Sequence, residues 1–269
     1  MLVRHHDRDR FQTALFAPAR HGEALFALYA FNYEVARVRE SVREPMLGQI
    51  RLQWWREAIA TAYDGGTPRH HQVVEAITDT IRSHVLSRED FDRLIDARER
   101  DLDDTPPATL AELEDYAEGT SARLIMLALE VLEAKTPASV QAAHHVGIAY
   151  ALAGLLRALP VHAAAGRSFV PDDIAAAAGL DSADLRGSPA LREAVRTIAA
   201  AASRHLAAAR ALRGALPRAA LPALLPACIA ANALRRLERA GFDPFQVAAT
   251  SSDPLQSWRL AYAMLVRRF

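Results

Sequence analysis

Residues 25–40 read Leu25-Phe-Ala-Leu-Tyr-Ala-Phe-Asn-Tyr-Glu-Val-Ala-Arg-Val-Arg-Glu40, and this stretch decides the fold. Its apolar and small residues recur with the three- and four-residue spacing that forms one face of a helix. That face consists of Leu25, Leu28, Tyr29, Asn32 and Ala36, and Glu40 follows one turn later. The spacing predicts a helix whose apolar face points into the protein.

A second stretch has the same character and is predicted to be the partner helix. Residues 147–159 are almost entirely apolar, and the stretch closes on Gly166, Arg167 and Pro171. No segment alternates with period two as a strand would, so the fold class is expected to be all-α. Further helices are expected over 7–16, 45–63, 70–83, 87–101, 109–133, 138–159, 174–178, 182–185, 188–212, 217–239 and 255–269.

Length and composition favour a single-domain helical bundle over 1–269. The 269 residues form no linker-like stretch, and a chain of this size can bury about 75% of its unfolded surface. Lysine plus arginine equals aspartate plus glutamate at 32 each, and no basic stripe is present, so a nucleic-acid partner is not expected. The single cysteine, Cys228, excludes an internal disulfide and indicates a reducing compartment.

Three blocks of sequence carry a resemblance to a known family. From about Phe11 to Tyr262 the chain resembles the squalene/phytoene synthases, which are all-helical prenyl synthases. Several blocks in the same order make the resemblance specific, and it implies a bundle of the isoprenoid synthase type. The blocks are Ala17-Pro18-Ala-Arg20 with Ala27-Leu28-Tyr29-Ala30-Phe31, then Asp101-Leu102 with Leu113-Glu114-Asp-Tyr116-Ala-Glu-Gly119-Thr120, and finally 147–157 with Gly166-Arg167-Ser-Phe169-Val-Pro171.

The resemblance also shows what this chain has lost. Active members carry paired aspartates, four residues apart, on two facing helices, where they hold the Mg²⁺ that neutralises a diphosphate leaving group. The corresponding positions here are Ala36, Glu40, Ala158 and His162, so three of the four carboxylates are missing. The resemblance therefore implies no metal and no cofactor, and Mg²⁺ would be required only by an enzyme with other ligands.

The surroundings of these positions differ from the family pattern as well. Arg37 stands where the family usually has an acid, and Gly154 stands where it usually has an asparagine. Pro160 removes a backbone donor and disfavours helix at Leu159. We therefore expect the second helix to end near Leu159, which would move His162 from its place one turn beyond Ala158.

One branch of the family shows the same pattern of loss. It contains the mitochondrial assembly factor of respiratory complex I and its bacterial relatives. This closer resemblance implies a pseudoenzyme that acts in assembly of the NADH dehydrogenase, with a complex I subunit or assembly protein as partner. The residues that carry it are Ala30-Phe31-Asn32, Glu34, Arg51-Leu-Gln53-Trp-Trp55, Glu99-Arg100, Leu102-Asp103-Asp104, Leu156-Arg157-Ala, Pro160, His162 and Ser257-Trp258-Arg259.

Two other functions stay open. The first is a Mg²⁺-dependent prenyl transferase acting on farnesyl or geranylgeranyl diphosphate, with Glu40, Asp101 or Asp103-Asp104 as replacement ligands. The second is a non-catalytic carrier of a lipid or isoprenoid in an apolar cavity between the two helices. By resemblance, the ligand-pocket candidates are Tyr29, Asp101, Tyr116 and Arg157, which can equally satisfy buried polar groups, and no residue is assigned a catalytic role.

Location is inferred from the absence of targeting patterns. Residues 1–10 have no apolar signal-peptide core, and the apolar run 219–234 contains two prolines and is shorter than the ~20 residues of a membrane helix. We expect a cytoplasmic protein, with contact to the inner membrane surface as the alternative. The helix over 255–269 carries Trp258, Tyr262 and Leu265 on one side, and we expect it to pack on the bundle rather than on a membrane.

Overall fold

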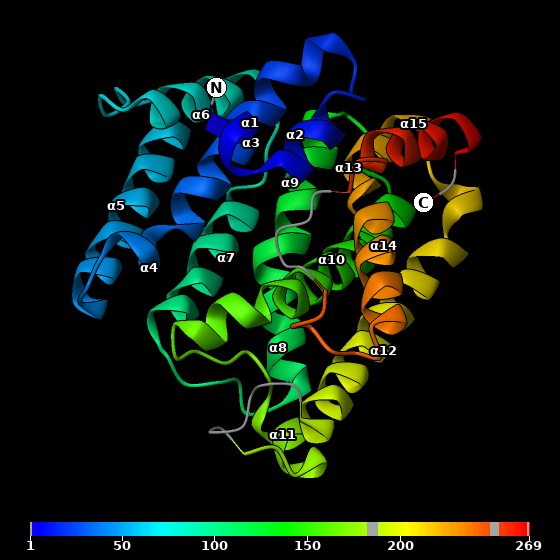
Figure 1. The fold of residues 1–269 in the computed structure, drawn as a ribbon. Helices are drawn as coiled ribbons and strands as arrows, with labels where there is room; N and C mark the ends of the chain where they lie inside the picture. Colours follow the sequence, from blue (N-terminus) through cyan, green and yellow to red (C-terminus); the bar gives the residue numbers. More distant parts are fainter. Residues whose placement is uncertain (1, 182–187, 248–252, 268) are drawn as a thin grey trace.

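Helices make up the bundle, and no strand occurs in the part of the chain that the structure describes, which confirms the all-α prediction. The structure is a computed structural model, and it describes residues 2–181, 188–247, 253–267 and 269 (Figure 1). The expected element at 182–185 lies outside these residues. The helices are α1 (Leu2–His6), α2 (Arg8–Ala14), α3 (Ala19–Ala36), α4 (Val38–Ser41), α5 (Pro45–Tyr63), α6 (Gln72–Ser83), α7 (Arg88–Glu99), α8 (Leu110–Ala117), α9 (Arg123–Val131), α10 (Pro137–Ala164), α11 (Asp172–Ala178), α12 (Pro189–Ala211), α13 (Leu221–Leu224), α14 (Pro226–Arg239) and α15 (Gln256–Val266).

The central element is α10, which contacts α9, α12 and α14. A capping box starts it: the Ser139 amide donates to the Thr136 hydroxyl at 3.1 Å, and the Thr136 amide donates to the Ser139 hydroxyl at 2.7 Å. Pro137 occupies the first helical position, where its missing N–H costs nothing. By length and composition alone α10 could cross a membrane, but these contacts are those of a core helix.

A π-helical turn separates α8 from α9, where the sequence predicted one continuous helix over 109–133. The turn spans Glu118–Ala122 and is buried. It presses against α10 so closely that a Cβ on Gly147 would lie 2.3 Å from the Ala122 Cα atom. Only glycine fits at position 147, because any side chain there would force the two backbones apart.

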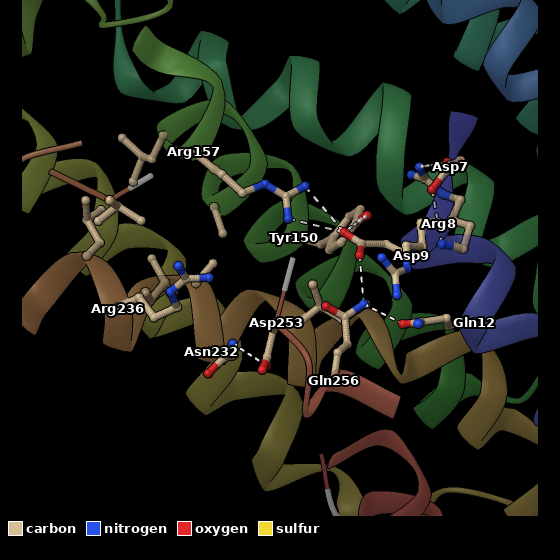
Figure 2. Close-up of a pocket in the computed structure, with 18 of the residues that line it drawn as sticks. Asp7, Arg8, Asp9, Gln12, Tyr150, Arg157, Asn232, Arg236, Asp253 and Gln256 are labelled. Carbon is tan, nitrogen blue, oxygen red and sulfur yellow. Dashed lines mark hydrogen bonds and ion pairs between the residues drawn. The ribbon is translucent and has the colours of Figure 1, made fainter. Parts of the chain in front are cut away.

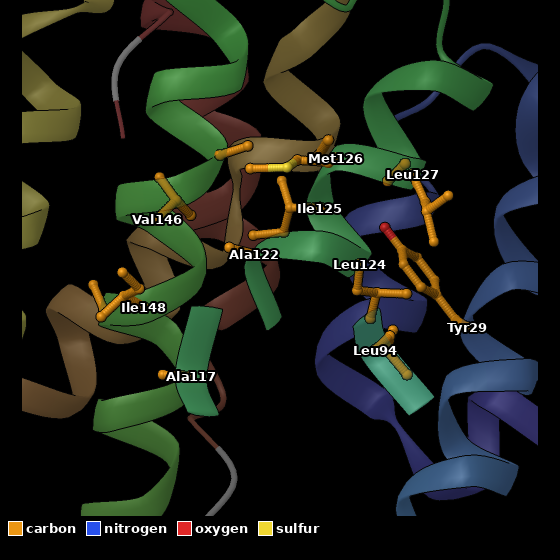
Figure 3. Close-up of a cluster of buried hydrophobic side chains, with 14 of the residues drawn as sticks. Tyr29, Leu94, Ala117, Ala122, Leu124, Ile125, Met126, Leu127, Val146 and Ile148 are labelled. Atoms are coloured by element: carbon orange, nitrogen blue, oxygen red, sulfur yellow. The ribbon is translucent and has the colours of Figure 1, made fainter. Parts of the chain in front are cut away.

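The hydrophobic core forms where α3, α7, α9 and α10 meet. Figure 3 shows Tyr29 of α3 beside Leu94 of α7 and Leu124 and Leu127 of α9. These leucines are fully buried and Tyr29 is 5% exposed. The inward face predicted for residues 25–32 is therefore confirmed.

Two proline-rich segments depart from the predicted helices. The expected helix over 217–239 is divided into α13 and α14, because Pro222 and Pro226 lack the amide that would continue it and each instead opens a helix. By contrast, Pro160 lies inside α10, which runs on to Ala164. The predicted end near Leu159 is wrong: Leu156, whose carbonyl loses the hydrogen bond from residue 160, and Leu159 are both buried, and their packing holds the helix together.

The last helix, α15, packs on the bundle through the side that the sequence did not favour. Leu260 and Ala263 are buried against Leu225 and Ile229 at the junction of α13 and α14. The side that carries Trp258 faces outward. The helix is therefore attached to the bundle, but its most apolar side remains exposed.

Candidate functional site

The four positions of the degenerate metal motifs come from α3, α4 and α10. Ala36 is the last residue of α3, and Arg37 leaves the helical conformation before α4 begins. Glu40 therefore lies on a separate short helix and is exposed. A pair of ligands four residues apart on one continuous helix does not exist here.

On α10 the helix continues, so His162 does lie one turn beyond Ala158. Its ring packs edge-on against Phe169, with ring centroids 4.9 Å apart. Burial lowers the pKa of His162, and the nearby Arg167 lowers it further, whereas Asp101 and Glu40 act in the opposite direction. This position therefore favours a neutral imidazole packed on an aromatic ring.

Beside His162, a hydrogen-bonded network joins two of the predicted pocket residues. Tyr116 donates to Asp101 at 2.7 Å, and Arg98 donates to the other Asp101 oxygen at 3.1 Å and to the Tyr116 hydroxyl at 3.0 Å. Burial acts to lower the pKa of Arg98, but Tyr116 and Asp101 outweigh it and the pKa is raised. Burial raises the pKa of Tyr116. A guanidinium thus supplies the positive charge next to Asp101.

Asp103 and Asp104, which were also proposed as replacement ligands, have hydrogen-bond partners within the protein. Asp104 binds Arg39 through both oxygens at 3.0 and 2.9 Å, and Arg167 lies 3.1 Å from it. Arg167 also donates to the backbone carbonyl of Asp101 at 2.9 Å. Asp103 accepts a hydrogen bond from the Thr105 amide at 2.9 Å.

These donors do not fit a magnesium–diphosphate site. Mg²⁺ requires oxygen ligands in near-octahedral arrangement, and the motif positions offer two methyl groups, an imidazole and one exposed carboxylate. Within the described residues, no group of three or more histidine, cysteine, aspartate or glutamate side chains could hold a metal ion. The arginines beside Asp101 and Asp104 would repel a cation.

The other two predicted pocket residues lie elsewhere. Arg157 donates from both terminal nitrogens to Asp9 of α2 at 3.3 Å, and Tyr150 donates to the same carboxylate at 3.4 Å. Tyr29 interacts electrostatically with Arg10, and its burial raises its pKa to about 12. The structure therefore brings Asp101 and Tyr116 together but places Arg157 and Tyr29 beside charged residues of α2.

Figure 2 shows the cavity into which Asp9 points, between α2, α10 and α14. Its volume is about 410 Å³, and Gln256 donates to Asp9 at 2.8 Å across it. Sequence reasoning missed Asp9 and Gln256, because they lie 247 residues apart and belong to no motif. Arg98 was missed as well, although its position three residues before Asp101 on a helix indicates an ion pair.

Two cavities adjoin the Asp101 network. One, of about 280 Å³, is lined by Tyr116, Phe169, Asp103, Asp104 and other charged residues. The other lies beside His162, is lined mainly by apolar side chains and has a volume of only about 10 Å³. The apolar space beside His162 is therefore too small for an isoprenoid chain in this structure, which gives no support to the carrier hypothesis at this place.

Comparison with known proteins identifies the sequence relatives. The family model for squalene/phytoene synthase matches residues 3–262. A relative from Bos taurus, "NADH dehydrogenase (ubiquinone) complex I, assembly factor 6", is 34% identical over 97% of this chain and 81% of its own length. A presqualene diphosphate synthase from Rhodopseudomonas palustris is 28% identical over 75% of this chain and 72% of its own length.

A solved structure confirms the fold that the resemblance implied. A crystal structure of a dehydrosqualene synthase in complex with ligand superposes with a TM-score of 0.85, over 98% of this chain and 93% of that chain. The two sequences are only 17% identical, so the likeness shows a shared isoprenoid synthase fold and nothing further.

Proposed function

This chain belongs to the squalene/phytoene synthase family, and we propose that it acts as an assembly factor for a respiratory NADH dehydrogenase, complex I, without prenyl-transfer activity. The relatives named complex I assembly factor 6 support this role, because the match extends over almost the whole chain. The names of these relatives describe assembly factors of NADH dehydrogenase (ubiquinone) complex I.

One observation carries the non-catalytic part of the proposal. Arg98 lies 3.1 Å from Asp101, beside positions where active members of the family hold Mg²⁺. A guanidinium cannot be deprotonated in a protein and cannot coordinate a metal ion. The carboxylate of Asp101, which a replacement Mg²⁺ site would need as a ligand, is here already neutralised by Arg98.

The partner in this proposal is a subunit of complex I or another protein of its assembly. The location in this proposal is the cytoplasm, including the cytoplasmic surface of the inner membrane. The relatives' names support the partner, and the genetic experiment described next tests it.

Deletion of the gene tests the assembly role directly. We expect the deletion strain to lose assembled NADH dehydrogenase on native gels and to keep its squalene-derived lipids and carotenoids. Complementation with a Glu40→Ala variant should restore assembly fully, because Glu40 is exposed and holds no ligand in this proposal. Normal assembly in the deletion strain, or loss of isoprenoid products instead, would contradict the proposal.

The relatives named presqualene diphosphate synthase favour prenyl transfer as the second candidate function. The cavity of about 280 Å³ that contains Asp103, Asp104 and Tyr116 is where such chemistry would take place. Incubation with Mg²⁺ and farnesyl diphosphate separates the two functions. We expect no product by mass spectrometry and no Mg²⁺-dependent binding by calorimetry, and turnover would establish the enzyme instead.

A further inference from the structure

The outward side of α15 presents large apolar side chains in a single row. Trp258, Tyr262 and Leu265 are 75%, 66% and 80% exposed, and Leu255, just before the helix, is 55% exposed. Their spacing of three, seven and ten residues places them within one quarter of the helix circumference. We call these four residues the α15 outer face. No part of the chain that the structure describes covers it.

This face differs from the scattered apolar residues of an ordinary surface. Single exposed leucines or valines are common, but a row of four on one helix marks an interaction site. Trp and Tyr have an apolar ring and a polar N–H or O–H group, which suits the boundary between lipid headgroups and acyl chains. The opposite side of α15 is buried through Leu260 and Ala263, so the bundle holds the face in a fixed direction.

A basic pocket lies at the C-terminal end of the same helix. Arg213, Arg218 and Arg267 line a cavity of about 160 Å³ together with Phe269, whose main-chain oxygen accepts a hydrogen bond from Arg210 at 3.2 Å. Arg267 ends α15 and is exposed, and Arg213 stacks on the Phe269 ring at 5.3 Å. The exposed guanidinium groups of Arg218 and Arg267 at this pocket suit a phosphate, because guanidinium groups bind phosphate oxygens through paired N–H donors.

We propose that α15 is an interfacial helix, which inserts its outer face into the surface of a bilayer while the basic pocket binds the phosphates of anionic phospholipids. The two features are adjacent and call for the two halves of one ligand, an apolar acyl region and a phosphate headgroup. Amphipathic helices with a Trp- and Leu-rich face and flanking arginines bind anionic membranes in this way, inserting about 5–10 Å deep.

A second copy of the chain fits this surface less well. A two-fold symmetric contact with parallel α15 helices would bring the two basic pockets close together, and the repulsion between them would oppose the apolar contact, whereas an antiparallel contact would leave both pockets without a ligand. The proposal goes beyond the assembly role and does not depend on it, since the surface would bind lipid whatever its client. Vesicle binding therefore tests this inference separately from the gene deletion.

The test is flotation of the purified protein with vesicles of phosphatidylcholine alone or with about 30% phosphatidylglycerol. We expect binding to the anionic vesicles that weakens in 0.5 M NaCl. The variant Trp258→Ser/Tyr262→Ser/Leu265→Ser should bind at least tenfold more weakly. The variant Arg218→Ser/Arg267→Ser should lose the preference for phosphatidylglycerol. All these side chains are exposed, so an unchanged urea midpoint will show that each variant folds.

A matched control uses another exposed apolar patch, at the start of α5. Met46 and Ile50 are 67% and 60% exposed, and Met46→Ser/Ile50→Ser should bind vesicles as the wild type does. Brominated lipid should quench wild-type tryptophan fluorescence more than that of Trp258→Phe. Absence of wild-type binding, or equal loss in the control variant, would overturn the proposal. So would a wild-type dimer that becomes monomeric in the triple variant without any vesicle binding.

Discussion

Arg98 and Asp101 form an ion pair inside the bundle, with 3.1 Å between the guanidinium nitrogen and the carboxylate oxygen and with side chains 16% and 11% exposed. The Tyr116 hydroxyl closes the network by bonding to both. The pair lies beside the positions from which the motif carboxylates have been lost. The guanidinium of Arg98 neutralises the carboxylate of Asp101, so Asp101 requires no bound cation.

Substitution Arg98→Ala should therefore destabilise the fold strongly. It leaves the carboxylate of Asp101 buried without its cation, which typically costs about 3–5 kcal/mol. Urea denaturation followed by circular dichroism measures the loss. Arg196→Ala is the control: its pair with Glu193 is on the surface, with side chains 54% and 53% exposed, and should contribute less than about 1 kcal/mol. A similar small loss for both variants would contradict the interpretation of the network.

Two glycines of α10 should respond to alanine in opposite directions. A Cβ on Gly147 would lie 2.3 Å from the backbone of Ala122, so Gly147→Ala should lower the unfolding free energy by about 1–3 kcal/mol. Gly154 has no atom within 4 Å of the same position, so Gly154→Ala should stabilise the helix by about 0.5–1 kcal/mol. Thermal unfolding of the two variants gives both signs. A stabilising Gly147→Ala would show that α10 does not press on the π-helical turn.

The protein should become less stable as the pH is lowered, because of a histidine pair between α10 and α12. The Nδ1 atoms of His145 and His205 lie 3.0 Å apart, so at least one ring must be neutral to accept the hydrogen bond. Burial, followed by neighbouring histidines, lowers the pKa of His145; burial also lowers the pKa of His205, although Glu114 opposes it. The unfolded chain then binds more protons, so stability is complete above about pH 6.5 and is lost as pH falls through the lowered pKa values.

Urea midpoints at pH 7.5 and 5.5 measure this effect. The double variant His145→Gln/His205→Gln should show a smaller difference between the two midpoints than the wild type. His70→Gln should leave the difference unchanged, because the side chain of His70 is fully exposed. A wild-type protein that is equally stable at both values of pH would rule out the histidine pair as a source of pH dependence.

Cys228 should react slowly with thiol reagents in the native protein. Burial raises its pKa to about 11, so less than about 1% of it is thiolate at pH 8, whereas a free cysteine is about 20–30% thiolate. We expect the native reaction with Ellman's reagent to be at least tenfold slower than the reaction in guanidinium chloride. A native rate equal to the unfolded rate would show an accessible thiolate at this position.

The periodicity of the sequence determined the helices and their inward faces. Leu25, Leu28 and Tyr29 are buried as their spacing predicted, and the helices expected to start at 87 and 109 do so, with Ser87 and Thr109 as their N-caps. These features are local, because they depend on spacing and on side-chain chemistry within one or two turns. The replacement of motif carboxylates by Ala36, Ala158 and His162 was equally visible, since it requires only the identity of residues at known positions.

What the tertiary structure alone decided depends on contacts between distant segments. Packing of Leu156 and Leu159 carries α10 through Pro160, and Asp9 of α2 captures Arg157, 148 residues away. The last helix has two apolar sides, and only the position of α13 and α14 selects Leu260 for burial and leaves Trp258 exposed. The sequence pattern shows which helix faces can be buried. Which of these faces is buried depends on the free energy of the whole assembled bundle.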